Sequence, residues 1–428
     1  MMQAWSAARL ARACRCLVVA GACCAACIES AAAQSAESWR TLAPGPISMA
    51  DGHITIGGDV SATYGSDDPG FFDYTDYGYS ALRMFRVSVT ALVKANDHVA
   101  VLGNVETENF STIRPYALYV RIRPWTTRDI DIQAGRIPPT FGAFARRTYV
   151  SDNPLIGFPL AYQYLSTLRP DALPASAEEL VLKKGTGWRV RYSVGSPAVE
   201  HGVPLASALR WDTGVQAHAS FLNGRALSVT ASVTNGTISN PLFKDDNGGK
   251  QVAGRLEWRP TPGLQIGTSV ARGEFVSDAA ASAAAAIAPR PIAATPFTQA
   301  AWGGDIEYSR EYFLMRAETI LSRWRVPFAA EPARTDPLDA LATFVEGRYK
   351  ITPGLYAAAR VDYLGFGSIA SAFGTTPWDA PVTRVEAGGG YSIVRNLLLK
   401  VSYQHNSRDG GRLPAHENLV ATQVVFWF

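Results

Sequence analysis

The chain has 428 residues, of which 47% are hydrophobic and only 18% are charged, and its formal net charge is +3. This composition is too apolar for a disordered chain, and the small net charge gives no electrostatic basis for binding nucleic acid. All five cysteines lie between Cys14 and Cys27. A disulfide framework, a cysteine-ligated zinc site and a cysteine nucleophile are therefore excluded from the rest of the chain.

The N-terminus has the pattern of a secretory signal peptide. A basic segment is followed by a run of apolar and small residues, Cys16–Ile28, and then by small residues suited to cleavage at Ala31–Ala33. We therefore expect residues 1–33 to be removed on export. Residues 34–50 would then form a short periplasmic lead-in, and residues 51–428 the mature domain.

The mature domain repeats one pattern, segments of about ten residues in which apolar and polar side chains alternate. Between residues 83 and 93, for example, Phe85 and Val87 are separated by Arg86. Alternation with a period of two predicts β-strands with one apolar face. By the same alternation we expect Tyr116 on the apolar face of its strand, opposite Arg121.

Short turns and long polar connections alternate between these segments, which is typical of outer-membrane β-barrels. Both ends of such a barrel lie in the periplasm, so the number of strands must be even. We expect sixteen strands, near residues 52–64, 82–95, 98–109, 115–124, 129–136, 211–222, 225–235, 250–259, 264–273, 302–309, 312–322, 340–350, 355–364, 382–393, 397–407 and 418–428.

The predicted fold class is thus all-β, a transmembrane, antiparallel, up-and-down β-barrel. Residues 188–194 also alternate. If they and one further strand belong to the wall, the barrel has eighteen strands, which is the alternative. Soluble β-sandwiches also alternate, but aromatic residues gather near the segment ends here, as in the interfacial girdles of membrane barrels.

The longest connection, residues 137–210, follows the fifth strand, and a connection of this length is usually functional. It contains eight Lys and Arg against five Asp and Glu. If it narrows a pore, this excess favours anions. The adjacent Arg146 and Arg147 are suited to bidentate binding of a carboxylate or phosphate.

The segment Gly135–Gly142, GRIPPTFG, resembles the G-x-x-P-x-x-F-G stretch of phosphate-selective and related porins. Together with the architecture of residues 51–428, it makes the chain similar to the Gram-negative porin superfamily. The resemblance implies that the loop after the fifth strand folds into the lumen and narrows it, and that the protein is a homotrimer. That loop contains only Lys183 and Lys184 where phosphate-selective members carry a lysine cluster, so phosphate specificity is not expected.

The C-terminus resembles the signal that ends bacterial outer-membrane proteins. Phe426 and Phe428 lie on one apolar face of the last predicted strand, and the chain ends on Phe428. The resemblance implies that these residues act as an assembly signal for the barrel-assembly machinery.

We therefore expect a porin of the bacterial outer membrane, surrounded by lipid, through which small hydrophilic solutes or ions diffuse passively with a mild preference for anions. The alternative is a non-conducting structural or adhesive barrel plugged by residues 137–210. The residues expected to line the pore or its constriction are Arg86, Arg121, Arg123, Arg136, Arg146, Arg147, Arg169, Arg316, Glu318, Arg360 and Asp362.

Enzymatic activity is not expected from the sequence. The chain has no Gly-rich phosphate loop and no H-E-x-x-H motif, and none of its six histidines forms a pair at metal-ligand spacing. The sequence therefore predicts neither a catalytic site nor a metal or cofactor.

Overall fold

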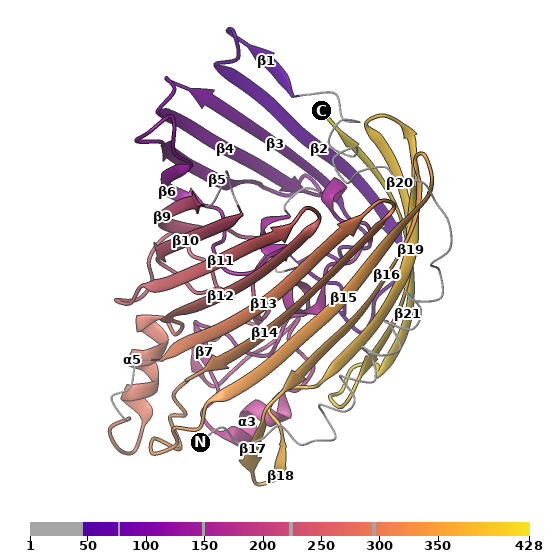
Figure 1. The fold of residues 1–428 in the computed structure, drawn as a ribbon. Coiled ribbons are helices and arrows are strands. Elements are labelled where there is room, and N and C mark those ends of the chain that lie inside the picture. Colours follow the sequence, from indigo (N-terminus) through magenta and orange to yellow (C-terminus); the bar gives the residue numbers. More distant parts are fainter. Residues whose placement is uncertain (1–45, 76–77, 148–149, 222–225, 293–296) are drawn as a thin grey trace.

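The computed structural model describes residues 46–75, 78–147, 150–221, 226–292 and 297–428. Sixteen antiparallel strands form a closed barrel (Figure 1). They are β2 (Ile54–Gly65), β3 (Phe85–Lys94), β4 (Val99–Glu108), β5 (Ile113–Ile122), β6 (Ile130–Ile137), β9 (Asp212–Phe221), β10 (Leu227–Thr234), β11 (Gln251–Thr261), β12 (Leu264–Glu274), β13 (Thr298–Arg310), β14 (Phe313–Trp324), β15 (Leu338–Thr352), β16 (Leu355–Phe366), β19 (Val382–Val394), β20 (Leu397–Arg408) and β21 (His416–Trp427).

The barrel closes between its first and last strands. β2 pairs with β21 from Asp59 opposite Trp427 to Gly65 opposite Ala421, and the backbone of Phe428 exchanges hydrogen bonds with that of Gly58. Each other strand pairs with its neighbours in sequence. The prediction of a sixteen-stranded, all-β, up-and-down barrel is confirmed.

The eighteen-stranded alternative is wrong. Residues 188–194 lie inside the long excursion between β6 and β9, where Val190 and Tyr192 are buried. Val190 forms an isolated bridge with Glu200, and Val194 and the following glycine pair, as β8 (Val194–Gly195), with another short strand of the same excursion, β7 (Ala172–Leu173). The alternating piece packs an apolar face inside the excursion and takes no part in the barrel wall.

Apolar side chains face outward and polar side chains inward along most strands. In β20, Val401 and Tyr403 are exposed, whereas Lys400 and Ser402 between them are buried. The alternation of strand side chains therefore leaves an apolar outer surface around the barrel. None of the helices in the described ranges is long and apolar enough to cross a membrane.

Short turns join the strands at one end of the barrel, here called the short-turn end, where Phe428 lies. Pro262-Gly263 and Pro353-Gly354 each form a two-residue turn in which the glycine has a φ of +85° or +84°. Proline fixes the first φ of such a turn, and glycine adopts a positive φ at the second without steric cost. The opposite end, the long-loop end, carries the hairpin β17 (Ser368–Ser371) and β18 (Gly374–Pro377), and the helix α5 (Asp278–Ile287) (Figure 1).

One predicted orientation is wrong. The register between β4 and β5 shifts after Asn104 opposite Ala117, because Tyr116 is an extra residue on β5. Such a bulge turns the following side chains to the other face. Tyr116 is therefore 3% exposed and its hydroxyl donates to the carbonyl of Ala208 in the excursion, so it faces the lumen and not the outer surface.

The excursion between β6 and β9 lies inside the barrel (Figure 1). It contains η2 (Phe144–Arg146), η3 (Val150–Asp152), α2 (Leu160–Gln163), β7, α3 (Ala177–Leu182) and β8. Its buried side chains, among them Leu168, Leu180 and Val190, form one apolar cluster with inward-facing wall residues such as Phe344 and Phe366. The implication that the loop after the fifth strand enters the lumen is confirmed.

The predicted signal peptide, residues 1–33, lies outside the described residues. Within the predicted lead-in, β1 (Ile47–Met49) pairs with the beginning of β2.

Candidate functional site

Glu318 of β14 holds the beginning of the excursion against the wall. Its carboxylate accepts hydrogen bonds from the backbone N–H groups of Ala143 and Phe144, at 2.9 and 3.3 Å, and from the hydroxyl of Tyr162 at 2.8 Å. A carboxylate satisfied by three donors anchors a segment that has no strand partner. Glu318 thus faces the lumen as predicted, but the excursion covers it, and only 3% of it is exposed.

Arg360 of β16 is the centre of a buried ionic network. Its guanidinium lies 3.2 Å from the carboxylate of Glu346, 3.0 Å from that of Asp362 and 2.6 Å from that of Glu386. It also donates to the carbonyl of Gly157, and Asp362 accepts from the backbone of the excursion at Leu160. Arg360 and Asp362 face inward, but they bind the excursion and do not contact open space.

Lys400 of β20 and Asp379, in the loop between β18 and β19, hold the excursion in the same way. Lys400 donates to the carbonyls of Val150 and Asn153, at 2.7 and 2.6 Å. Asp379 accepts from the backbone N–H groups of Thr167 and Gly185. The excursion is thus fastened over most of its length to the wall between β14 and β20.

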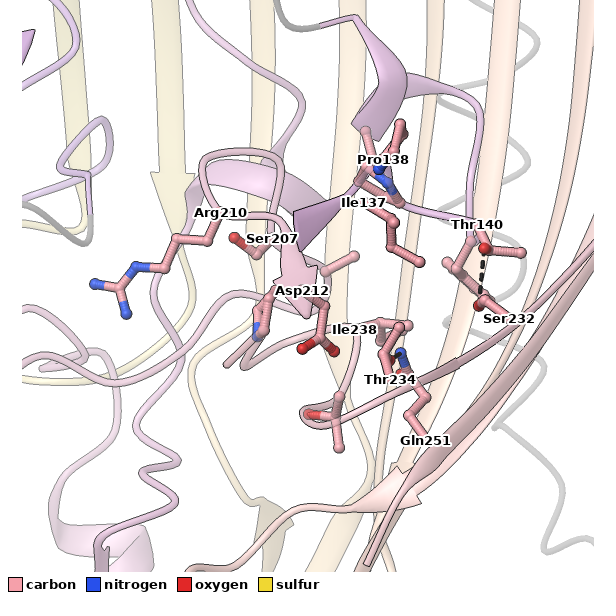
Figure 2. Close-up of a pocket in the computed structure, with 16 residues that line it drawn as sticks. Ile137, Pro138, Thr140, Ser207, Arg210, Asp212, Ser232, Thr234, Ile238 and Gln251 are labelled. Carbon is pink, nitrogen blue, oxygen red and sulfur yellow. Dashed lines mark hydrogen bonds between the residues drawn. The ribbon is translucent and has the colours of Figure 1, made fainter. Parts of the chain in front are cut away.

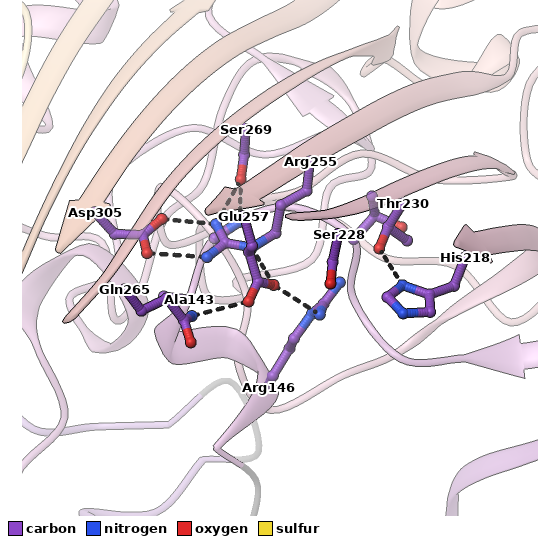
Figure 3. A network of polar contacts seen from close by, with 12 residues as sticks. Ala143, Arg146, His218, Ser228, Thr230, Arg255, Glu257, Gln265, Ser269 and Asp305 are labelled. Atoms are coloured by element: carbon purple, nitrogen blue, oxygen red, sulfur yellow. Dashed lines mark hydrogen bonds and ion pairs between the residues drawn. The ribbon is translucent and has the colours of Figure 1, made fainter. Parts of the chain in front are cut away.

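Arg146 and Arg147 point to different carboxylates. Arg146 lies 3.3 Å from Glu257 and Arg147 lies 2.7 Å from Glu307. Figure 3 shows Arg146 approaching Glu257, which also binds Arg255, while Arg255 forms two bonds with Asp305. The two adjacent guanidiniums therefore form no joint anion clamp in this structure, although the side chain of Arg146 stays 31% exposed.

The other predicted lining residues divide into two groups. Three of them lie on inward positions of β3, β5 and β14, namely Arg86, Arg121 and Arg316. Arg86 is buried against Glu106, and Arg316 binds Glu307. Arg121 is half-buried. Arg123 is exposed in the turn that follows β5.

Two predicted lining residues lie elsewhere. Arg136 pairs across the sheet with the exposed Leu118, which places it on the outer face, where it stacks on Phe243. Arg169 is buried within the excursion, where it binds Asp171 and the carbonyl of Val190. Neither contacts the lumenal space, because strand alternation turns Arg136 outward and the fold of the excursion encloses Arg169.

A cavity in the barrel has a volume of about 400 Å³. It lies between the excursion and the wall formed by β3 to β6, β9 and β10. Its lining residues are Thr90, Leu102, Gly103, Asn104, Tyr116, Ala117, Tyr119, Asp131, Gln133, Pro138, Arg146, Trp211, Gln216, His218 and Thr230. Of the predicted residues, only Arg146 lines it. Alternation alone does not reveal the others, because the bulge at Tyr116 and the course of the excursion determine which positions stay open.

A second cavity, of about 40 Å³, lies between the beginning of the excursion and β9 to β11 (Figure 2). Thr140 donates from one side of it to Gln216 and lies 2.8 Å from the hydroxyl of Ser232. Asp212, also in its lining, accepts from the backbone of Gly236 and Leu242 in the loop after β10. This small space is thus a packing gap between anchored segments.

Two buried carboxyls, Asp68 and Asp73, lie in the loop between β2 and β3. They predict that the docking of this loop against the rest of the barrel depends on pH. Burial raises the pKa of Asp73 to about 7, although the Arg384 guanidinium 3.0 Å away opposes the shift. Burial also raises the pKa of Asp68 to about 6. Because both carboxyls bind protons more tightly in the docked loop than in the released one, protonation stabilises the docked loop below a pH of about 4. This stabilisation is lost as the pH rises through 6 to 7 and the carboxyls ionise.

We therefore expect a protease to cut the loop between β2 and β3 faster at pH 8 than at pH 5. Asp73→Asn removes one titrating group and keeps a hydrogen-bonding side chain, so it should reduce the pH dependence. Wild type and variant are digested in parallel at each pH, and their ratio cancels the pH dependence of the protease itself. A ratio that stays constant from pH 5 to 8 would contradict the assignment.

No protein-family model matches the chain, and no curated protein matches it. Solved structures match it across most of its length. They include a loop-deletion form of OmpT, an outer membrane protein of Vibrio cholerae, with 13% identity and a TM-score of 0.50. The chain has the fold of the outer-membrane porins.

Two further solved structures are similar to this chain over most of its length. OmpF of Salmonella typhi, solved with daunomycin, has 12% identity and a TM-score of 0.51, and the match covers 88% of this chain and 97% of OmpF. An anion-selective porin from Comamonas acidovorans has 8% identity and a TM-score of 0.51, with 88% and 99% of the two chains covered. The match to OmpT covers 88% and 99%. At these identities the likeness establishes the fold, and the predicted resemblance to porins is confirmed at that level.

Proposed function

We propose that the protein is an outer-membrane channel through which small hydrophilic solutes diffuse passively, without catalysis or a cofactor. The observation that carries this proposal is the cavity of about 400 Å³ that the excursion leaves along β3 to β6, β9 and β10. Half-buried inward-facing groups, among them Arg121, Ser220 and Gln265, continue from it toward the short-turn end. An open space with polar groups in its lining, inside a closed barrel with an apolar exterior, is what passive diffusion across a bilayer requires.

We also propose a mild preference for anions. Arg146 is the only Lys or Arg among the described residues that line the cavity, and its side chain is more exposed than that of its partner Glu257, at 31% against 13%. The excess of cations over anions in residues 137–210 acts in the same direction. The preference is mild because Asp131 lines the same cavity.

Reconstitution in planar bilayers tests both statements. We expect discrete conductance steps. In a salt gradient, we expect the reversal potential to be displaced toward the equilibrium potential of the anion. Arg146→Ala should move the reversal potential toward zero, whereas Arg123→Ala, which removes an exposed arginine from a turn, should not. Protein that inserts without conducting would contradict the channel, and an unchanged reversal potential in Arg146→Ala would contradict the anion preference.

A second function has an observation of its own. Between the cavity and the long-loop end, Arg86, Glu106 and Glu108 are at most 4% exposed. This favours a non-conducting structural or adhesive barrel in which residues 137–210 act as a plug. Absence of conductance in the intact protein, with conductance after removal of the plug, would support this alternative.

The outer-membrane location rests on the apolar outer surface and is testable at Val401, which is 48% exposed on the lipid-facing side of β20. We expect Val401→Arg to lower the free energy of unfolding in lipid vesicles by about 2–4 kcal/mol, because a charge is transferred into hydrocarbon. Phe373→Arg is the matched control, since Phe373 is 56% exposed in the β17–β18 turn. Equal effects of the two substitutions would contradict a lipid-facing β20.

The remaining features belong to the same proposal. Cleavage of residues 1–33 is proposed from their signal-peptide pattern. Assembly of a homotrimer and recognition of Phe426 and Phe428 by the barrel-assembly machinery are proposed from the sequence resemblance. Phe426 lies on the outer face, 40% exposed, where an assembly factor has access to it. The mass of the purified protein in detergent, measured by sedimentation, tests the trimer.

A further inference from the structure

We propose that the cavity of about 400 Å³ is a binding site for a neutral, polyhydroxylated solute of the size of a mono- or disaccharide. This inference rests on the proposed function, because it assigns a solute class to the same lumenal space. The volume lies within the ~300–1,000 Å³ that is usual for small-molecule sites.

The cavity combines ring surfaces with hydrogen-bonding groups. Trp211 lies 5.3 Å from Tyr116 and 6.4 Å from Tyr119, measured between ring centroids, so the three rings form one aromatic cluster, in which the tyrosine rings are tilted at 51° and 42° to the indole. Amide, hydroxyl and imidazole groups supply the rest of the polar lining. Sugars present apolar C–H faces and hydroxyl edges, and aromatic rings beside fixed hydrogen-bonding groups match both.

Two polar atoms of the lining residues lack a partner within the described part of the chain. The indole Nε1 of Trp211 is buried without an acceptor. The amide of Asn104, a residue that is 8% exposed, donates to Ser88 and Thr90, while its Oδ1 has no donor. A buried unsatisfied donor or acceptor is costly, and a hydroxyl group can satisfy either kind because it both donates and accepts.

The charges of the cavity are already engaged, which favours a neutral ligand. Arg146 binds Glu257, and Asp131 accepts from the amide of Gln133 at 2.7 Å. His218 contacts the hydroxyl of Thr230 at 3.0 Å (Figure 3) and that of Ser220 at 3.1 Å. A charged ligand would have to displace one of these pairs, whereas a hydroxylated ligand only needs to add to them.

Calorimetric titration of the purified full-length protein tests the site. The protein is kept in a detergent without a sugar headgroup and titrated with glucose, sucrose and disodium succinate. We expect saturable binding of glucose or sucrose and none of succinate. Trp211→Phe, which keeps a ring but removes the N–H, and Asn104→Leu should each weaken binding roughly five- to tenfold. Trp125→Phe, at an exposed tryptophan in the turn after β5, should leave it unchanged.

The titration separates this proposal from the channel itself. Binding in detergent requires no conduction, so a protein that binds sugar but fails in bilayers would overturn only the channel. A protein that conducts but binds neither glucose nor sucrose would overturn only the site. Binding of succinate in their place, or sugar binding that both folded variants retain in full, would also overturn the site.

Discussion

Arg360→Ala is expected to destabilise the barrel more than any other single substitution considered for this chain. The guanidinium is fully buried among Glu346, Asp362 and Glu386. Its removal takes the nearest cation from three buried carboxylates, of which Glu346 keeps only the guanidinium of Arg316 at 3.6 Å. Breaking a buried ionic network in this way costs about 3–5 kcal/mol. The free energy of unfolding in guanidinium, measured from lipid vesicles, checks this.

Arg323→Ala is the matched control for that substitution. Arg323 also pairs across the wall with an aspartate, Asp339, at 2.6 Å, but the two side chains are 48% and 31% exposed. An exposed pair of this kind contributes about 0–1 kcal/mol. Equal losses in the two variants would mean that water reaches Arg360 and that the excursion does not seal this part of the wall.

Removal of residues 163–204 is expected to raise the single-channel conductance several-fold. The backbone N–H of Ala206 donates to the carbonyl of Ala161 at 3.1 Å, so a linker of two glycines can join the remaining ends. The deletion removes ten of the nineteen buried apolar residues that the excursion contributes to the cluster in the lumen. It also removes the backbone donors of Thr167 and Gly185 that cover Asp379. Conductance in planar bilayers checks the result, because it follows the cross-section of the pore.

A deletion in a hairpin at the long-loop end controls for the loss of chain. Residues 369–376 belong to the β17–β18 hairpin at the long-loop end (Figure 1), and the flanking Ser368 and Pro377 already pair. Shortening this hairpin should leave conductance nearly unchanged. A conductance that is equal in wild type and in the variant without residues 163–204 would show that the excursion does not obstruct the pore.

The barrel could be predicted from the sequence because each strand is specified locally. One apolar face toward the outside and one polar face toward the inside give a period of two that is readable residue by residue. Pro-Gly turns such as Pro353-Gly354 mark the short-turn end. The requirement for an even number of strands then placed the longest excursion after the fifth strand, where the structure has it.

The site could be predicted only in part, because it depends on contacts far apart in the sequence. Glu318, Arg360 and Asp362 were recognised as inward-facing, but alternation does not reveal that the excursion covers them. Tyr116 was misplaced, because a one-residue bulge leaves no mark in the hydrophobic pattern. Trp211 and Asn104 were missed, since only the folded excursion determines which part of the wall stays open.

The most direct test of the central claim uses single cysteines. The described barrel contains no cysteine, since all five of the chain precede residue 28. His218→Cys places a thiol in the cavity, and Ser402→Cys places one beneath the excursion, where Ser402 is 2% exposed. With a charged, water-soluble thiol reagent added during single-channel recording, we predict that His218→Cys loses most of its conductance and that Ser402→Cys keeps it. A block at Ser402→Cys, or none at His218→Cys, would contradict a solute path along β3 to β10.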